Sequence, residues 1–236
     1  VRYHRDQHFT MIRNWVGQTG DAEFYEACDR YGILVWQDFW LANPADGPDP
    51  ENADMFLKNS WDYLRRIRHH ACLALYCGRN EGYPPQEIND ALPRYIAALH
   101  PGMEYIPSSA DDGVSGHGPY RALPSREYFQ RITPLFHTER GMPCMLTWDG
   151  LARTLHEDEW WPQGHVWGQH DFTLQGAQRC ATFNELVEQA FGKPVSARQF
   201  AQWAQWINFN GYRAMFESNH VTRSGLLLWM SREVRA

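Results

Sequence analysis

The sequence lacks the features that mark a membrane protein or a nucleic-acid-binding protein. Its 236 residues contain no apolar run of transmembrane length, and no pattern typical of a signal peptide opens the chain. They contain no basic block either, and the formal net charge is -6. We therefore expect neither a membrane nor a nucleic acid as a partner.

Metal-binding and phosphate-binding motifs are also absent. The five cysteines, at positions 28, 72, 77, 144 and 180, are odd in number and form no Cys-x-x-Cys pair, which predicts buried free thiols. The eleven histidines include no His-Glu-x-x-His motif, so we interpret them as structural or surface residues. No Gly-Lys phosphate loop occurs, and the segment GVSGH at residues 113–117 falls one residue short of a nucleophile elbow.

Apolar and aromatic residues are plentiful. A hydrophobic content of 43% with 21% charged residues predicts a packed globular core. Aromatic residues make up 14% of the chain and include 11 tryptophans. Some of these must fill the core, and others suit a ligand such as a sugar, whose apolar C–H faces stack on aromatic rings. The chain begins with Val1 rather than Met, and we expect it to be a fragment of a longer protein.

Short apolar runs alternate with helical patterns. The patterns predict strands near residues 9–15, 33–36, 73–77, 105–107, 135–138 and 225–230, and helices near residues 24–31, 54–68, 86–99, 127–132, 176–191 and 197–218. We expect Gly32 to end the first of these helices, the capping box at residues 196–199 to start the last, and Pro93 to interrupt the third. Continuous apolar strands that alternate with helices indicate an α/β fold with a parallel sheet covered by helices.

Two glutamates follow apolar runs of strand length. Glu81 comes after residues 73–77 and Glu139 directly after residues 135–138, and each precedes a Gly/Pro turn. In a parallel α/β barrel both would project from the rim where catalysis takes place. A carboxylic acid and a carboxylate at such a rim can cleave a glycosidic bond as acid and nucleophile. The alternative is that each is an ordinary acidic loop residue.

Several segments resemble the catalytic barrel of glycoside hydrolase family 2, which includes β-galactosidases, β-mannosidases, β-glucuronidases and exo-β-glucosaminidases. The resemblance rests on MIRNW at residues 11–15, FY and CD at residues 24–25 and 28–29, GILVWQDF at residues 32–39, NE at residues 80–81, TERG at residues 138–141 and GLLLW at residues 225–229. The matches run from about Phe9 to Met230 in the family's order. They are strongest for the β-mannosidase and exo-β-glucosaminidase branch.

The resemblance implies a (β/α)8 TIM barrel over residues 1–236, incomplete because the family's first strand has no counterpart here. It implies a retaining β-glycosidase that acts on an oligosaccharide or glycoside with Glu81 as acid/base and Glu139 as nucleophile, and that needs no metal or organic cofactor. It further implies flanking β-sandwich domains in the full-length protein. The compartment stays open, with a periplasmic or secreted location favoured over the cytoplasm.

Six further residues are candidates for substrate binding. Arg13 can hold the nucleophile ionised, Asn80 can bind a sugar hydroxyl beside the reacting carbon, and Asp38 can bind other hydroxyls. Trp229, Trp15 and Trp36 can stack on sugar rings. The structural alternatives are a packing arginine, a turn-forming asparagine, a loop acid and core tryptophans.

Two departures from the family pattern concern the sugar that is recognised. Arg140 stands where the family usually has an aromatic residue, and VGQ at residues 16–18 replaces a Gly-rich loop. A β-galactosidase or β-glucuronidase activity therefore stays open. So do a non-catalytic carbohydrate-binding or scaffold barrel and a metal-dependent hydrolase, the last of which EDTA sensitivity would reveal.

Overall fold

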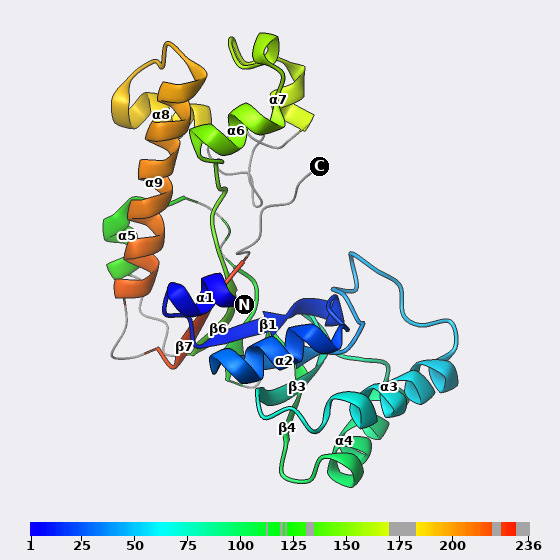
Figure 1. The fold of residues 1–236 in the computed structure, drawn as a ribbon. Coiled ribbons are helices and arrows are strands. Elements are labelled where there is room, and N and C mark those ends of the chain that lie inside the picture. The colour runs from blue at the N-terminus through cyan, green and yellow to red at the C-terminus, as the bar shows by residue number, and fades with distance from the viewer. Residues whose placement is uncertain are drawn as a thin grey trace. The chain divides into compact units, whose positions relative to one another are not determined.

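The computed structural model describes residues 1–111, 113–118, 120, 122–130, 135–169, 183–218 and 223–229. The chain divides into two compact units, Val1–His117 and Gly118–Ala236, each of which is described by itself (Figure 1). Cys180, Met230, residues 176–182 of a predicted helix and residues 131–132 of another lie outside the described residues.

The first unit is built on a parallel four-stranded sheet with the order β1-β2-β3-β4. Its elements are α1 (Arg2–Asp6), β1 (Met11–Asn14), the 3₁₀ helix η1 (Trp15–Gly17), α2 (Ala22–Tyr31), β2 (Leu34–Asp38), α3 (Ala53–Ile67), β3 (Leu73–Arg79), α4 (Gln86–Leu99), β4 (Glu104–Ser108) and the short β5 (Val114–Ser115). Helices α3 and α4 pack side by side, as Figure 1 shows. Parallel strands need such crossover helices between them.

The core of this unit explains why its strands are apolar throughout. Val35 of β2 and Tyr76 of β3 are 0% exposed, and they pack with Leu64 of α3 and Ile88 of α4. Each fully buried aliphatic or aromatic side chain contributes about 1.5–3 kcal/mol. Helix boundaries follow their caps: Asn52 accepts a hydrogen bond from the Met55 N–H at the start of α3, and Gly32 ends α2 at a φ of 69°.

The expected interruption at Pro93 is wrong, because α4 runs through this residue from Gln86 to Leu99. A proline inside a helix costs about 3 kcal/mol through a lost hydrogen bond and a steric clash. The helix buries Ile88 and Leu92 before the proline and Ile96 after it. Burial of apolar residues on both sides outweighs the local cost.

The second unit combines a parallel strand pair with helices around one long helix. Its elements are α5 (Ser125–Gln130), β6 (Phe136–Arg140), α6 (Trp148–Thr154), the 3₁₀ helix η2 (Glu157–Glu159), α7 (His165–Gln169), α8 (Phe183–Phe191), α9 (Ala197–Glu217) and β7 (Gly225–Leu228). Strands β6 and β7 pair in parallel. Figure 1 shows α9 flanked by α5, α6 and α8, all of which it contacts. Ser196 caps α9 by accepting the Gln199 N–H, as the sequence predicts.

The protein is thus an α/β protein with parallel sheets. Among the described residues neither sheet closes into a barrel, and the organisation of the chain as one barrel domain stays a prediction. Three predicted buried thiols are confirmed, since Cys28, Cys72 and Cys77 are buried and free. The expectation is wrong for Cys144, which is free but exposed, because it lies in an extended segment outside the sheet.

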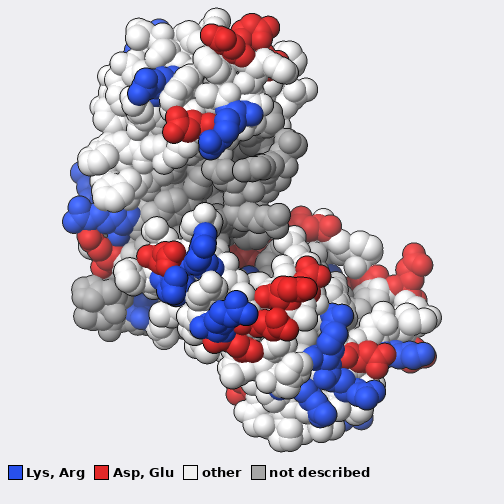
Figure 2. All heavy atoms as spheres, viewed as in Figure 1, with Lys and Arg blue, Asp and Glu red and all other residues white. Residues whose placement is uncertain are grey.

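The described surface carries charges of both signs. On the face shown in Figure 2, basic and acidic side chains are interspersed rather than gathered into one patch. No described helix has the length and hydropathy that crossing a membrane requires.

Hydrogen exchange should distinguish the edge strands from the centre of the sheet. Strand β3 pairs with β2 on one side and β4 on the other, whereas β1 is an edge strand and β7 is paired with β6 on one side. We therefore expect the amides of β1 and β7 to exchange faster than those of residues 73–77, because edge hydrogen bonds open without disturbing a neighbour. Equal protection measured by mass spectrometry in a monomer would mean that both edges are covered.

Candidate functional site

Glu81 lies in the loop that follows β3, held by side chains from three loops. Its side chain is 12% exposed, and its Oε2 accepts a hydrogen bond of 2.7 Å from Asn43 Nδ2. His117 Nδ1 lies 3.3 Å from Oε1. The Glu81 backbone has a φ of 50°, and its N–H donates to Ser109 Oγ at 3.0 Å. Because a non-glycine residue adopts this conformation at a cost, the surroundings must hold Glu81 in place.

Arg13 connects the ends of three neighbouring strands. Its Nη2 lies 2.7 Å from Asp38 Oδ2 and donates to Asn80 Oδ1 at 2.8 Å. Strand register explains the contact with Asp38: Arg13 is paired with Trp36 across β1 and β2, and Asp38 follows two residues later on the same face. The pair is almost fully buried, so removal of one partner would leave an uncompensated charge at a cost of about 3–5 kcal/mol.

Asp38 is wholly enclosed by protein groups. Its oxygens accept hydrogen bonds from Arg13, from Trp36 Nε1 at 2.8 Å and from the Val16 N–H at 3.1 Å. Val16 has a φ of 43°, which is strained for a β-branched residue. Its hydrogen bond to Asp38 holds this conformation within the VGQ segment at residues 16–18.

Glu139 lies in the second unit, next to the last residue of β6, and is 4% exposed. Tyr120 Oη donates a hydrogen bond to Glu139 Oε2. The Tyr120 ring also meets the Trp229 ring edge to face, with centroids 6.2 Å apart. The carboxylate, a phenol donor and a partly exposed tryptophan are therefore linked within this unit.

Gly141 allows β6 and β7 to approach closely beyond Glu139. The Trp229 N–H donates to the Arg140 carbonyl at 3.0 Å. A Cβ atom on Gly141 would lie 1.9 Å from the Trp229 carbonyl oxygen, closer than any real contact. Arg140 is itself buried, with its guanidinium 5.3 Å from the centre of the Tyr128 ring. The basic residue after Glu139 is therefore part of the packing and makes a cation–π contact.

The structure brings together some of the candidates from the sequence. In the first unit Arg13, Asp38, Asn80 and Trp36 form one hydrogen-bonded group, and Glu81 is adjacent to Asn80 in the chain. Trp15 opens η1 and is partly exposed. In the second unit Glu139 and Trp229 are linked through Tyr120.

Sequence reasoning missed Asn43, His117 and Tyr120, each of which contacts a candidate catalytic carboxylate. Asn43 and His117 lie in loops with no periodic pattern that would single them out. Within the described ranges, no group of three or more His, Cys, Asp or Glu side chains is placed to hold a metal ion.

His137 should make the stability of the second unit depend on pH. It is 3% exposed, and burial, followed by the charges of Arg140 and Arg223, lowers its pKa to about 4. The unfolded chain binds a proton near pH 6.5 that the folded chain does not bind until about pH 4. Stability present at neutral pH should therefore fall as the pH drops between these values, by about 3 kcal/mol in total.

Thermal unfolding between pH 7 and pH 4 measures this effect. His137→Leu removes the titrating group, so its Tm should fall less over this range than that of the unaltered protein. His165→Gln, at an exposed histidine of the same unit, should leave the pH dependence unchanged. The same fall in Tm for His137→Leu as for the control would contradict the attribution of this pH dependence to His137.

Three comparisons place the chain among known proteins. No family model matches it. A mannosylglycoprotein endo-β-mannosidase from Lilium longiflorum is 26% identical over 294 aligned positions, which cover 98% of this chain and 30% of the lily protein. β-Mannosidase B from Aspergillus fumigatus is 29% identical over 220 positions, which cover 75% of this chain and 26% of the fungal protein. The chain thus spans less than a third of the length of the curated relatives that it matches.

Solved structures share its fold. A β-D-mannosidase from Dictyoglomus thermophilum superposes with a TM-score of 0.77 at 24% identity, covering 96% of this chain and 31% of that enzyme. An exo-chitosanase from Amycolatopsis orientalis gives a TM-score of 0.80 at 18% identity, covering 97% and 31%. This chain therefore has homologues among β-mannosidases and the fold of the corresponding third of these two enzymes.

Proposed function

We propose that the full-length protein is a retaining β-glycoside hydrolase of the β-mannosidase or exo-β-glucosaminidase type within glycoside hydrolase family 2. The observation that carries the proposal is the placement of Glu81 and Glu139 at the ends of parallel strands, each carboxylate held by a neutral hydrogen-bond donor, in a chain similar to β-mannosidases along most of its length. The degradation of oligosaccharides or polysaccharides is the process that this activity would serve.

The reaction would run in two steps. In the first, the ionised Glu139 attacks the anomeric carbon, while the protonated Glu81 gives its proton to the leaving glycosidic oxygen as the C–O bond breaks. In the second, Glu81 takes a proton from water, and the resulting nucleophile displaces Glu139 from the anomeric carbon. Two displacements restore the β configuration.

The surrounding groups suit these roles. Tyr120 would place the Glu139 carboxylate for attack through its hydroxyl, and Asn43 would orient Glu81. Asp38 and Asn80 hold the guanidinium of Arg13. Arg13 would keep a carboxylate ionised in the assembled site, and Asn80 would bind the hydroxyl next to the reacting carbon.

Aromatic residues would complete the sugar-binding surface. Trp229, Trp15 and Trp36 are the proposed stacking platforms. Trp36 is 2% exposed, so only a small edge of its ring is available, whereas Trp15 and Trp229 are partly exposed. Asp38 would act on the substrate mainly through Arg13 because both of its oxygens accept protein hydrogen bonds.

The proposed architecture is a partial (β/α)8 barrel to which both units contribute strands. In the assembled site of a retaining enzyme the Glu81 and Glu139 carboxyl groups should lie about 5–5.5 Å apart. A crystal structure of the full-length protein measures this separation. A distance near 10 Å in an intact site would indicate inversion or a wrong pairing.

A panel of substrates tests the function. The full-length protein should hydrolyse p-nitrophenyl β-mannoside or β-glucosaminide faster than the β-galactoside or β-glucuronide, and NMR should show the β anomer as the first product. Preference for the last two would move the protein to another branch of the family. Loss of activity with EDTA would indicate a metal-dependent hydrolase, and binding of a mannosaccharide without turnover would indicate a scaffold.

A further inference from the structure

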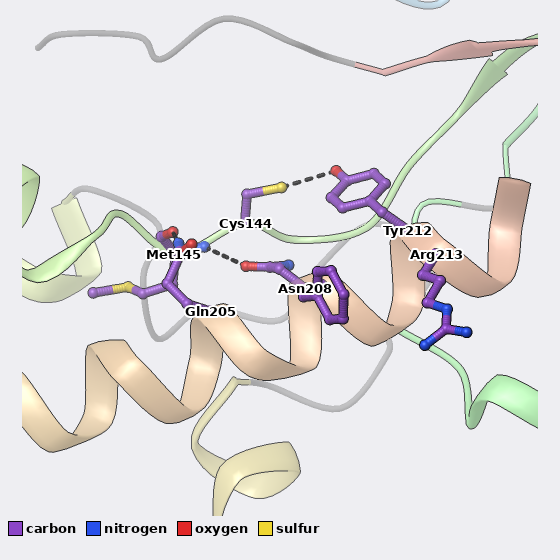
Figure 3. Close-up of a pocket in the computed structure, with 7 residues that line it drawn as sticks. Cys144, Met145, Gln205, Asn208, Tyr212 and Arg213 are labelled. Atoms are coloured by element: carbon purple, nitrogen blue, oxygen red, sulfur yellow. Dashed lines mark hydrogen bonds between the residues drawn. The ribbon is translucent and has the colours of Figure 1, made fainter. Parts of the chain in front are cut away.

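The chain leaves the sheet after Glu139 as an extended segment. Residues 142–147 belong to no helix or strand, so their backbone groups need hydrogen-bond partners from elsewhere. Side chains of α9 bind several of these groups, and Figure 3 shows Asn208 bound to Met145 in the pocket that both residues line. The position of this segment is therefore set by side chains rather than by sheet hydrogen bonds.

Asn208 is the centre of this attachment. Its Nδ2 donates to the Pro143 carbonyl at 2.7 Å, and its Oδ1 accepts the Met145 N–H at 3.0 Å. The residue is 6% exposed, so water cannot replace either bond at low cost. A primary amide is suited to this task because it offers a donor and an acceptor from one side chain.

Other residues on the same face of α9 extend the attachment. Gln205 Nε2 donates to the Met145 carbonyl, and Tyr212 Oη donates to the Met142 carbonyl at 3.4 Å. Positions 205, 208 and 212 are three and four residues apart, which places them on one side of a helix. Gly211 lets Met142 approach on that side, because a Cβ there would lie 2.5 Å from the Met142 sulfur.

Glu139 lies close to both attachments. Strand β6 pairs with β7 before Glu139, at Phe136 and His137, and after it, at Arg140, whose carbonyl binds the Trp229 N–H. Helix α9 holds the segment that begins three residues after Glu139. Gly141 joins Arg140 to this segment, and it lies so close to the Trp229 carbonyl that an added Cβ would overlap the carbonyl oxygen.

We propose that Asn208 is a positioning residue for Glu139. Asn208 acts through the segment at residues 142–145 and never touches the substrate. The inference rests on the proposed function, since it assigns Glu139 as nucleophile. A nucleophile displaced by a fraction of an ångström from its line of attack reacts more slowly while the substrate still binds. Asn208 should thus affect the rate of covalent bond formation and not the affinity for the sugar.

Trapping of the covalent intermediate measures the rate of covalent bond formation separately from the affinity for the sugar. With 2-deoxy-2-fluoro-β-D-mannosyl fluoride, Glu139 forms a bond to the anomeric carbon and fluoride leaves. In the full-length protein, Asn208→Leu removes both hydrogen bonds at similar volume and should slow the inactivation rate constant about 10–100-fold, with the inhibition constant changed less than twofold. Asn208→Asp keeps the acceptor for Met145 and should show an intermediate effect.

The control is Asn210→Leu, which changes a partly exposed amide on the same helix that donates to the Trp206 carbonyl within that helix. Its inactivation kinetics should equal those of the unaltered protein. Should Asn208→Leu fail to fold by circular dichroism, Asn208→Asp decides the question. Equal rate constants for the Asn208 and Asn210 variants of an active protein would overturn the inference.

Hydrogen exchange gives a second readout that needs no substrate. Asn208→Leu should speed exchange at the Met145 amide and also at the Trp229 amide, which binds the Arg140 carbonyl next to Glu139. Faster exchange confined to Met145 would mean that the effect stops short of Glu139 and would overturn the inference. Failure to label Glu139 in a protein that hydrolyses the β-mannoside would instead refute the proposed role of Glu139 as nucleophile, and the inference with it.

Discussion

Glu139→Ala should abolish turnover of every substrate by the full-length protein, with a loss of at least about 10⁴-fold in kcat/KM. The reason is that attack on the anomeric carbon always needs the nucleophile, whatever the leaving group. Added azide should not restore a product of retained configuration, because no covalent intermediate forms. Initial rates on aryl glycosides and NMR of the products measure both expectations.

Glu81→Ala should behave differently. A leaving group such as 2,4-dinitrophenolate departs without a proton, so these substrates should still form the covalent intermediate, whereas substrates with poor leaving groups should lose about 10²–10⁴-fold. Azide needs no general base, so it should speed release and yield a β-glycosyl azide. The opposite behaviour of the two variants would exchange the roles of Glu81 and Glu139.

A matched control separates these effects from general damage. Glu157→Gln changes an exposed carboxylate in η2 and should leave turnover within twofold of the unaltered protein. Circular dichroism and Tm should be unchanged for Glu81→Ala, whose side chain lies in a loop. A loss of activity that tracks a loss of folded protein would argue against a chemical role.

Gly141→Ala should have the largest effect on folding of the second unit. The added Cβ would lie 1.9 Å from the Trp229 carbonyl oxygen, and this neighbour is backbone, which cannot rotate away as a side chain can. Relief requires β6 and β7 to separate beyond Arg140. We expect a destabilisation of about 3 kcal/mol or more, measured as a lower denaturant midpoint or as loss of soluble protein.

Gly168→Ala is the matched control for this variant. Gly168 lies within α7, and nothing lies within 4 Å of the position that its Cβ would occupy. Alanine is the better helix former, so this change should leave stability unaltered or raise it by up to about 1 kcal/mol. If Gly141→Ala were as stable as Gly168→Ala, the close approach of β6 and β7 would be wrong.

Local patterns in the sequence were sufficient for most of the elements. Continuous apolar runs predicted β2 and β3, and the caps at Gly32 and Ser196 predicted the end of α2 and the start of α9. These features succeed because burial and capping act between residues close in the chain. The same reasoning placed Glu81 after β3 and put Glu139 at the end of β6.

The sequence failed where distant residues decide the outcome. Pro93 stays within α4 because Ile88, Leu92 and Ile96 are buried against other elements, a gain that no local rule contains. Cys144 is exposed because its segment is extended and attached to the surface of α9. In both cases the tertiary environment outweighs the preference of the single residue.

The sequence by itself determined an α/β protein with parallel strands and two strand-end glutamates, because strand and helix periodicity and turn residues are local properties. Only the tertiary structure decided which groups meet those glutamates: Asn43 and His117 at Glu81, and Tyr120 at Glu139. It also decided that Asn208, 69 positions after Glu139 in the sequence, holds the segment behind it. A hydrogen bond between side chains from different loops leaves no periodic trace in the sequence, since it depends on how the elements pack.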